Sequence, residues 1–129
     1  MELINGQAGY LGNVNVKKDG ISHQWSLHEV EEYSKCVNDA AYFARNYIKI
    51  VHLDKGLTSF DLYPYQEEMF KHFEDNRFSI VLACRQSGKS ISSVVYLLWY
   101  ALFHPDKTIA ILANKGATAR EMLSRATLA

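Results

Sequence analysis

Gly88, Lys89 and Ser90 are the residues of this chain whose types and spacing most clearly predict chemistry. They complete a phosphate-loop pattern, G-x-x-x-x-G-K-[ST], in which Ala83 stands at the position of the first glycine. In such a loop, backbone N–H groups at the start of a helix bind a phosphate chain, and Lys89 would supply a cation near the bridging and terminal phosphates. The Ser90 hydroxyl would coordinate Mg²⁺. The pattern therefore predicts a nucleoside triphosphate and Mg²⁺ as ligands.

The segments on both sides of this pattern have the composition that a phosphate loop requires. Residues 78–83 form a short apolar run with the branched pair Ile80 and Val81, which is typical of a strand buried on both faces of a parallel sheet. From Lys89 to about Phe103, apolar residues recur at helical spacing, namely Ile91, Val94, Val95, Leu98 and Leu102. A strand, a loop and a helix in this order make a chance Gly-Lys-Ser turn the weaker interpretation.

The composition predicts one domain with a single core. The chain has 129 residues, 48% of them hydrophobic, and its 14 basic and 14 acidic residues cancel. A neutral chain carries no overall charge signature of nucleic-acid binding. The stretch from Lys107 onward is nonetheless basic, and it could either approach phosphates or form a solvated helix face.

Several features predict a cytoplasmic protein that is neither secreted nor embedded in a membrane. Cys36 and Cys84 are too few and too far apart for a disulfide framework or a CxxC metal site. No stretch reaches the length of a membrane span, and the N-terminus lacks the basic start and apolar core of a signal peptide. The histidines show no H-x-x-x-H spacing, and we interpret the glutamate pairs 31–32 and 67–68 as solvated helix faces.

Capping residues and apolar spacing predict the other elements of the chain. Residues 1–25 are expected to form an extended or mobile arm. Beyond it, a Ser26/Glu29 capping box predicts a helix that runs to about Cys36. A second helix is expected to be capped by Asn38 or Asp39, to carry Phe43, Tyr47 and Ile50 on one face, and to end at Asp54 to Gly56. The remaining expected elements are a helix from Pro64, a strand over 108–113 and a helix from about Ala117.

The order of these elements predicts an α/β fold, with an incomplete parallel sheet of the P-loop NTPase type preceded by a mainly helical segment. Residues 26–129 would form a partial P-loop ATPase domain. It has a helical lead-in over 26–75 and a strand-loop-helix-strand-helix unit over 78–129. A nucleoside triphosphatase of this kind normally adds an apolar strand ending in Asp-Glu, which holds Mg²⁺ and orients the attacking water. The sequence has no such strand.

Several stretches of the chain resemble a known protein family. They are Asn38 to Tyr47, Leu53 to Gly56 with Leu62 to Gln66, Arg85-Gln86 inside the loop pattern, and Ile111 to Gly116. Together they resemble the N-terminal part of the ATPase domain in the terminase large subunit of tailed phages, the motor that packages DNA into procapsids. The resemblance covers residues 36–125. Members of this family are several times longer, so the chain looks like a truncated product or a fragment.

The resemblance implies that the nucleotide is ATP and gives residues that would recognise its base. Gln66 would read the adenine edge, because a carboxamide presents both a donor and an acceptor. The alternative is that Gln66 is an exposed helix residue. One of the side chains of Tyr63, Pro64 and Tyr65 would pack on the adenine ring.

The resemblance also implies roles around the phosphates. Arg85 would be an arginine finger in cis that acts with Lys89 in catalysis, although a salt bridge that holds the loop is an alternative role for Arg85. Asn114 and Lys115 are weaker candidates for coupling to DNA. The expected nucleotide-binding residues of the loop and helix start are Arg85, Gln86, Ser87, Gly88, Lys89, Ser90 and Ile91, with Ser90 as the metal ligand.

In the full-length family member, ATP hydrolysis would drive DNA translocation in the host cell cytoplasm. The implied partners are double-stranded DNA, the portal protein and the small terminase subunit, with several motor subunits forming a ring on the portal. Residues 1–129 alone are expected to bind ATP poorly and to show little or no hydrolysis, because the Asp-Glu strand is missing. The alternatives are a fragment of a superfamily-2 helicase and a non-catalytic nucleotide-binding protein that docks on another ATPase.

Overall fold

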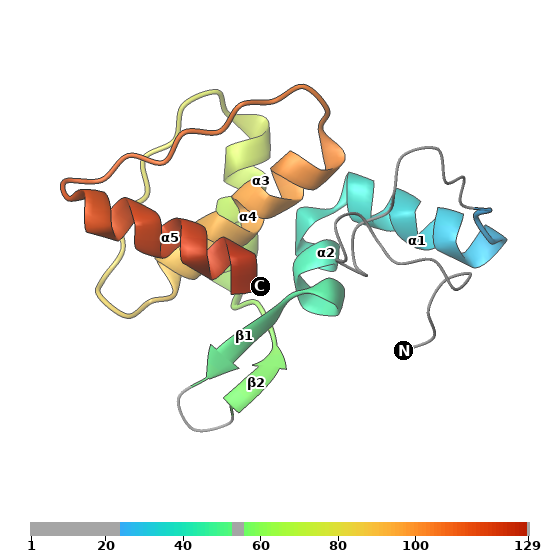
Figure 1. Cartoon of the computed structure of the whole chain (residues 1–129), viewed down its shortest axis with the longest axis horizontal. Coiled ribbons are helices and arrows are strands. Elements are labelled where there is room, and N and C mark those ends of the chain that lie inside the picture. The colour runs from blue at the N-terminus through green and yellow to red at the C-terminus, as the bar shows by residue number, and fades with distance from the viewer. Residues whose placement is uncertain (1–23, 53–55, 129) are drawn as a thin grey trace, which may run out of the picture. The chain divides into compact units, whose positions relative to one another are not determined.

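The computed structural model describes residues 24–52 and 56–128 (Figure 1). The chain divides into two units, residues 1–30 and 31–129. Apart from residues 24 and 25, the predicted N-terminal arm lies outside the described residues. The elements are α1 (Leu27–Asn38), α2 (Ala40–Tyr47), β1 (Lys49–His52), β2 (Gly56–Ser59), α3 (Pro64–Asp75), α4 (Lys89–Phe103) and α5 (Gly116–Leu128).

Both predicted caps of the first two helices are present. Before α1, Ser26 N–H donates to Glu29 Oε2 at 2.8 Å and Glu29 N–H donates to Ser26 Oγ at 3.2 Å, which confirms the capping box. Asp39 is the residue that caps α2, because its Oδ1 accepts from the N–H groups of Ala41 at 2.8 Å and Tyr42 at 2.9 Å. These bonds satisfy backbone donors that a helix start leaves free.

A β-hairpin follows α2 where the sequence analysis expected more helix. The helix ends at Tyr47, so the prediction that Ile50 shares its face was wrong. β1 pairs antiparallel with β2, and the branched residues Ile50 and Val51 suit a strand better than a helix. Gly56 at the start of β2 has a φ of 69°, which favours glycine. The rest of the expected helix end, residues 53–55, lies outside the described residues.

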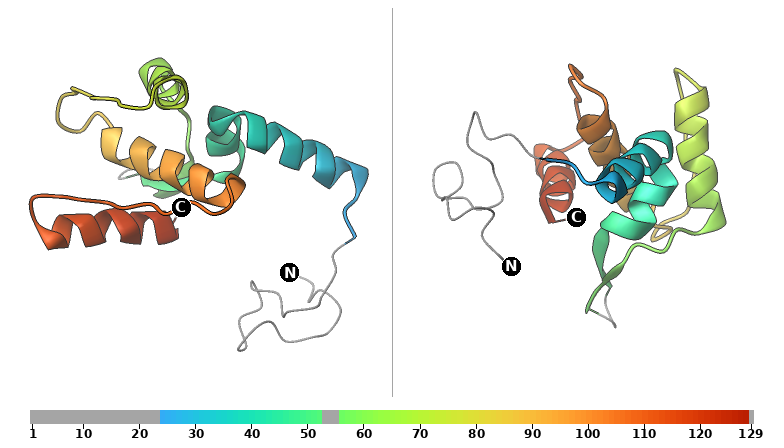
Figure 2. Two further views of the ribbon diagram at one scale, coloured as in Figure 1. Left: turned by 90° about the horizontal axis from the view of Figure 1, so that it is seen from above. Right: turned by 90° about the vertical axis from the view of Figure 1, so that its right-hand side faces the viewer.

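The core forms around α4, which contacts α2, α3 and α5. Both views in Figure 2 place α4 between α3 and α5. Trp99 on α4 is buried, and its indole Nε1–H donates to the Cys36 carbonyl near the end of α1 at 2.6 Å. Aromatic side chains dominate the packing, including Phe43, Phe70, Phe73, Tyr96, Trp99 and Phe103. In the described ranges, no helix combines the length and apolar character that a membrane span needs.

Glu32 accepts three hydrogen bonds, two of which join α1 to α2. Its Oε1 accepts from Lys35 Nζ at 2.7 Å, and its Oε2 accepts from the hydroxyls of Tyr42 at 2.8 Å and Tyr47 at 3.0 Å. The Glu32 side chain is only 18% exposed. The interpretation of this glutamate as part of a solvated face was therefore wrong.

The two predicted strands beside the loop pattern are not formed. Residues 79–84 and 107–113 have no regular secondary structure, and Phe78, Ile80 and Leu82 are 82%, 95% and 100% exposed. An extended segment becomes a strand when a neighbour pairs with its N–H and C=O groups, and no other described segment does so here. The chain thus has both helices and strands, but the sheet formed by its described residues is the antiparallel β1–β2 pair, not a parallel one.

Candidate functional site

The phosphate-loop pattern forms a turn that leads directly into α4. Gln86 and Gly88 both have left-handed backbone conformations, with φ values of 62° and 76°. Gly88 is the N-cap residue of α4, and the helix begins at Lys89, as the sequence predicted. The N–H groups of the first helical turn have no carbonyl partner within the helix, so they are available to an anion at this end.

The side chains of the turn bond to its own backbone. The Cys84 carbonyl accepts from Ser87 Oγ at 3.0 Å and from Lys89 Nζ at 2.8 Å. The Lys89 ammonium is therefore held across the opening of the turn. An ammonium has three N–H donors, so two of them remain for phosphate oxygens even while this bond is kept.

The N-terminus of α3 lies against the turn. Gln66 is 1% exposed, and its Oε1 accepts from Tyr63 N–H at 2.9 Å, while Gln66 N–H donates to the Tyr63 carbonyl at 2.9 Å. A Cβ atom built on Gly88 would come within 2.7 Å of Gln66 Nε2, so the carboxamide sits directly beneath this glycine. The alternative that Gln66 is an exposed helix residue was therefore wrong.

Two tyrosines form an exposed aromatic pair beside the turn. The rings of Tyr63 and Tyr65 are stacked, with centroids 5.8 Å apart and an interplanar angle of 8°. Their exposed fractions are 63% and 44%. The Tyr65 hydroxyl donates to the Ser87 carbonyl, so this pair contacts the turn formed by the phosphate-loop pattern. Flat, exposed rings at this position could stack with a nucleobase.

The other predicted site residues are less constrained. Arg85, Gln86 and Ser90 are exposed, and Ile91 is half-buried on the first turn of α4. Arg85 makes no ion pair with any described residue, so the alternative in which it holds the loop by a salt bridge has no support here. Asn114 and Lys115 lie immediately before α5 and are exposed, and no hydrogen bond joins their side chains to the turn within the described ranges.

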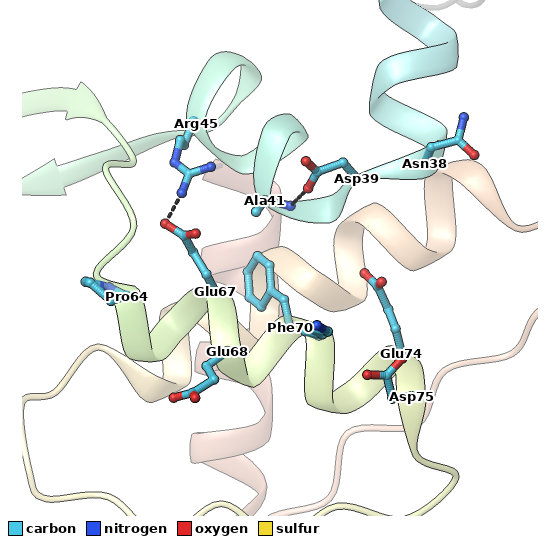
Figure 3. A pocket seen from close by; sticks show the side chains of 11 residues that line it. Asn38, Asp39, Ala41, Arg45, Pro64, Glu67, Glu68, Phe70, Glu74 and Asp75 are labelled. Carbon is cyan, nitrogen blue, oxygen red and sulfur yellow. Dashed lines mark hydrogen bonds and ion pairs between the residues drawn. The ribbon is translucent and has the colours of Figure 1, made fainter.

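A cavity between α2 and α3 was not foreseen from the sequence. It has a volume of about 670 Å³ (Figure 3). Its charged lining consists of Asp39, Glu67, Glu68, Glu74 and Asp75 together with Arg45 and Lys71. Arg45 forms an ion pair with Glu67, whose side chain is 40% exposed, and Glu68 is exposed, so both glutamates lie on a solvated face as expected.

The electrostatics of this cavity differ from those of the turn. Burial, and then the nearby carboxylates of Asp39 and Asp75, raise the pKa of Glu74. The seven-residue spacing of Glu67 and Glu74, and of Glu68 and Asp75, was the signal in the sequence, because such pairs share a helix face. No residue of the turn lines the cavity. Within the described ranges, no group of three or more His, Cys, Asp or Glu side chains is arranged to hold a metal ion.

No family model matches this chain. The resemblance to terminase large subunits therefore depends on the residues quoted for it in the sequence. The geometry around Lys89 gives an independent basis for assigning chemistry to the site.

Proposed function

We propose that the chain binds ATP with Mg²⁺ at the turn formed by residues 84–88 and the first turn of α4. The observation that carries this proposal is the position of Lys89. Its ammonium bonds to the Cys84 carbonyl across a turn that ends in a left-handed glycine and opens a 15-residue helix. A fixed cation beside free helix N–H groups favours binding of a polyphosphate.

Each residue of the proposed site has a role that its chemistry allows. Lys89 and the N–H groups of residues 86–90 would bind the phosphates, and the exposed Ser90 hydroxyl would coordinate Mg²⁺. Mg²⁺ would neutralise phosphate charge. Arg85 is free to reach a terminal phosphate with its planar fork of N–H groups. The base would lie near Tyr63 and Tyr65.

At the level of the whole protein, we propose the nucleotide-binding part of a terminase large subunit. Residues 78–83 and 108–113 would then be strands of a larger parallel sheet. Double-stranded DNA, a portal protein, a small terminase subunit and the host cytoplasm belong to this proposal by resemblance. Hydrolysis by residues 1–129 alone is not expected, because the sequence lacks the apolar strand ending in Asp-Glu that would hold Mg²⁺ and orient the attacking water.

Isothermal titration calorimetry with Mg²⁺ and ATP tests this proposal. The Lys89→Ala variant should bind ATP at least about tenfold more weakly than the parent chain, because each charge-assisted phosphate contact contributes about 1.5–3 kcal/mol. Lys49→Ala is the matched control, since it removes the same charge from the exposed strand β1. Equal ATP affinity of the parent and the Lys89→Ala variant would show that the loop assignment is wrong.

A further inference from the structure

The N-terminus of α3 contacts the phosphate-loop turn at two consecutive residues. The Tyr65 hydroxyl donates to the Ser87 carbonyl, and the Gln66 carboxamide packs beneath Gly88. We propose that Tyr65 and Gln66 are positioning residues for phosphate binding. Tyr65 would set the orientation of the turn, and Gln66 would set its distance from α3. This inference rests on the proposed function, because it concerns the same site.

Tyr65 would act on a peptide plane. The carbonyl of Ser87 and the N–H of Gly88 belong to one peptide unit, which is planar and trans. Because Tyr65 holds the carbonyl toward α3, the Gly88 N–H must point the opposite way, away from α3. The Ser87 side chain is fixed as well, because its Oγ donates to the Cys84 carbonyl at 3.0 Å. The hydroxyl of Tyr65 thus pre-orients a phosphate donor that it does not itself touch.

Gln66 would act by packing. Its Oε1 is held by Tyr63 N–H at 2.9 Å, so the carboxamide cannot rotate without losing that bond. The side chain is 99% buried, and its Nε2 faces the Cα of Gly88 closely enough to leave no room for a Cβ atom. A buried group of fixed position keeps the turn from collapsing onto α3. The left-handed φ of Gly88 adds a second reason for glycine at this position.

This role makes a prediction that differs from base recognition. Residues that orient the phosphate donors affect every ligand with a triphosphate chain, whatever its base. A residue that reads the adenine edge affects ATP but not inorganic tripolyphosphate. The comparison of ATP, GTP and tripolyphosphate therefore separates positioning of the turn from contact with the base.

The test uses Tyr65→Phe, which removes only the hydroxyl. We expect calorimetry to show about threefold to tenfold weaker binding of ATP, GTP and tripolyphosphate alike, each with Mg²⁺, as the loss of one hydrogen bond predicts. Gln66→Met, which keeps the volume of the side chain, should also weaken the three ligands by a common factor. Tyr100→Phe is the matched control, because the Tyr100 hydroxyl makes no hydrogen bond to a described residue and lies near the opposite end of α4 from the turn. It should leave all three affinities unchanged.

A measurement without ligand distinguishes failure of this inference from failure of the proposed function. In ¹⁵N relaxation experiments, Tyr65→Phe should lower the order parameters of the amides of residues 86–88, while the unfolding midpoint of the variant stays that of the parent chain. Unchanged order parameters, or a loss of affinity confined to ATP, would overturn the positioning role. If the parent chain bound none of the three ligands, the proposed function would fall, and the order parameters would still show whether Tyr65 holds the turn.

Discussion

Among single residues, Glu32 couples protonation to the stability of the fold. The hydrogen bond from Lys35, followed by those from Tyr42 and Tyr47, lowers the pKa of Glu32 from its ordinary value of 4.5 to about 2. A carboxyl whose pKa is lower in the folded state stabilises the fold above its unfolded pKa and loses this contribution as the pH falls through the folded pKa. The contribution of Glu32 is therefore present above pH 4.5 and is lost between pH 4.5 and about 2.

We predict that Glu32→Gln reduces the pH dependence of stability in this window. The parent chain should lose stability between pH 4.5 and about 2, whereas the variant, which lacks the titrating group, should lose less over the same range. Urea unfolding at several pH values, followed by circular dichroism, measures this difference. Glu121→Gln is the control, because Glu121 is 61% exposed and pairs only with Arg125 in the described structure. An equal reduction in both variants would contradict a special role for Glu32.

The sequence predicted the local conformation of the site residues better than their tertiary contacts. The loop pattern and the start of the helix at Lys89 follow from local sequence, because a phosphate loop is a contiguous motif. The burial of Gln66 beneath Gly88 could not be predicted, because it depends on two segments about 20 residues apart meeting in space. The start of α4 was therefore predicted correctly from the sequence, whereas the burial of Gln66 was not.

At the scale of elements, α4 organises the core, and Trp99 links it to the end of α1. The indole N–H donates to the Cys36 carbonyl, and Cys36 lies in the last turn of α1, where carbonyls have no partner within the helix. The ring also packs against Tyr96, Phe103 and His104. The Trp99 side chain thus packs in the core and also gives a hydrogen-bond donor to a carbonyl at the end of α1.

Trp99→Phe tests this role. Leaving the Cys36 carbonyl without its donor should cost about 1–3 kcal/mol of unfolding free energy, and the smaller ring should add a cavity cost. Urea unfolding followed by far-ultraviolet circular dichroism measures the change. Leu112→Ala is the control, because Leu112 is 88% exposed, and it should change the stability by less than about 0.5 kcal/mol. A loss in Trp99→Phe no larger than that in the control would argue against the anchor.

Helices could be predicted from the sequence because their signals are local. Pro64 at the first position of α3 and the apolar spacing after Lys89 specify helices with little help from the rest of the chain. Strands depend on partners that are distant in sequence, which is why the runs at 78–83 and 108–113 were predicted as strands and lie unpaired. The hairpin was missed because Ile50 fits a helical period as well as a strand.

At the scale of the whole molecule, the unpaired segment 78–83 exposes a row of large apolar side chains. Phe78, Ile80 and Leu82 alternate along it, and each is more than four-fifths exposed. An extended segment with exposed apolar residues and free backbone groups tends to pair with other chains. We therefore predict that residues 1–129 self-associate at high concentration.

Replacing Ile80 and Leu82 by serine should reduce this association without destabilising the fold, because neither side chain packs in the core. Sedimentation equilibrium should give a mass close to the 14.7 kDa of one chain for the double variant and a higher average mass for the parent. Leu57→Ser is the control, since Leu57 is 64% exposed on β2, away from this row. A monomeric parent chain, or equal suppression by Leu57→Ser, would count against the prediction.

We propose that a nucleoside triphosphate binds where the turn meets α4. Amide chemical-shift mapping during titration with ATP and Mg²⁺ tests this binding most directly. We predict that the largest shifts fall on residues 84–91, with smaller shifts at Tyr65 and Gln66, and that they vanish in the Lys89→Ala variant. Shifts concentrated around the cavity between α2 and α3, for example at Asp39 and Glu74, would contradict the account. So would a spectrum that ATP at millimolar concentration leaves unchanged.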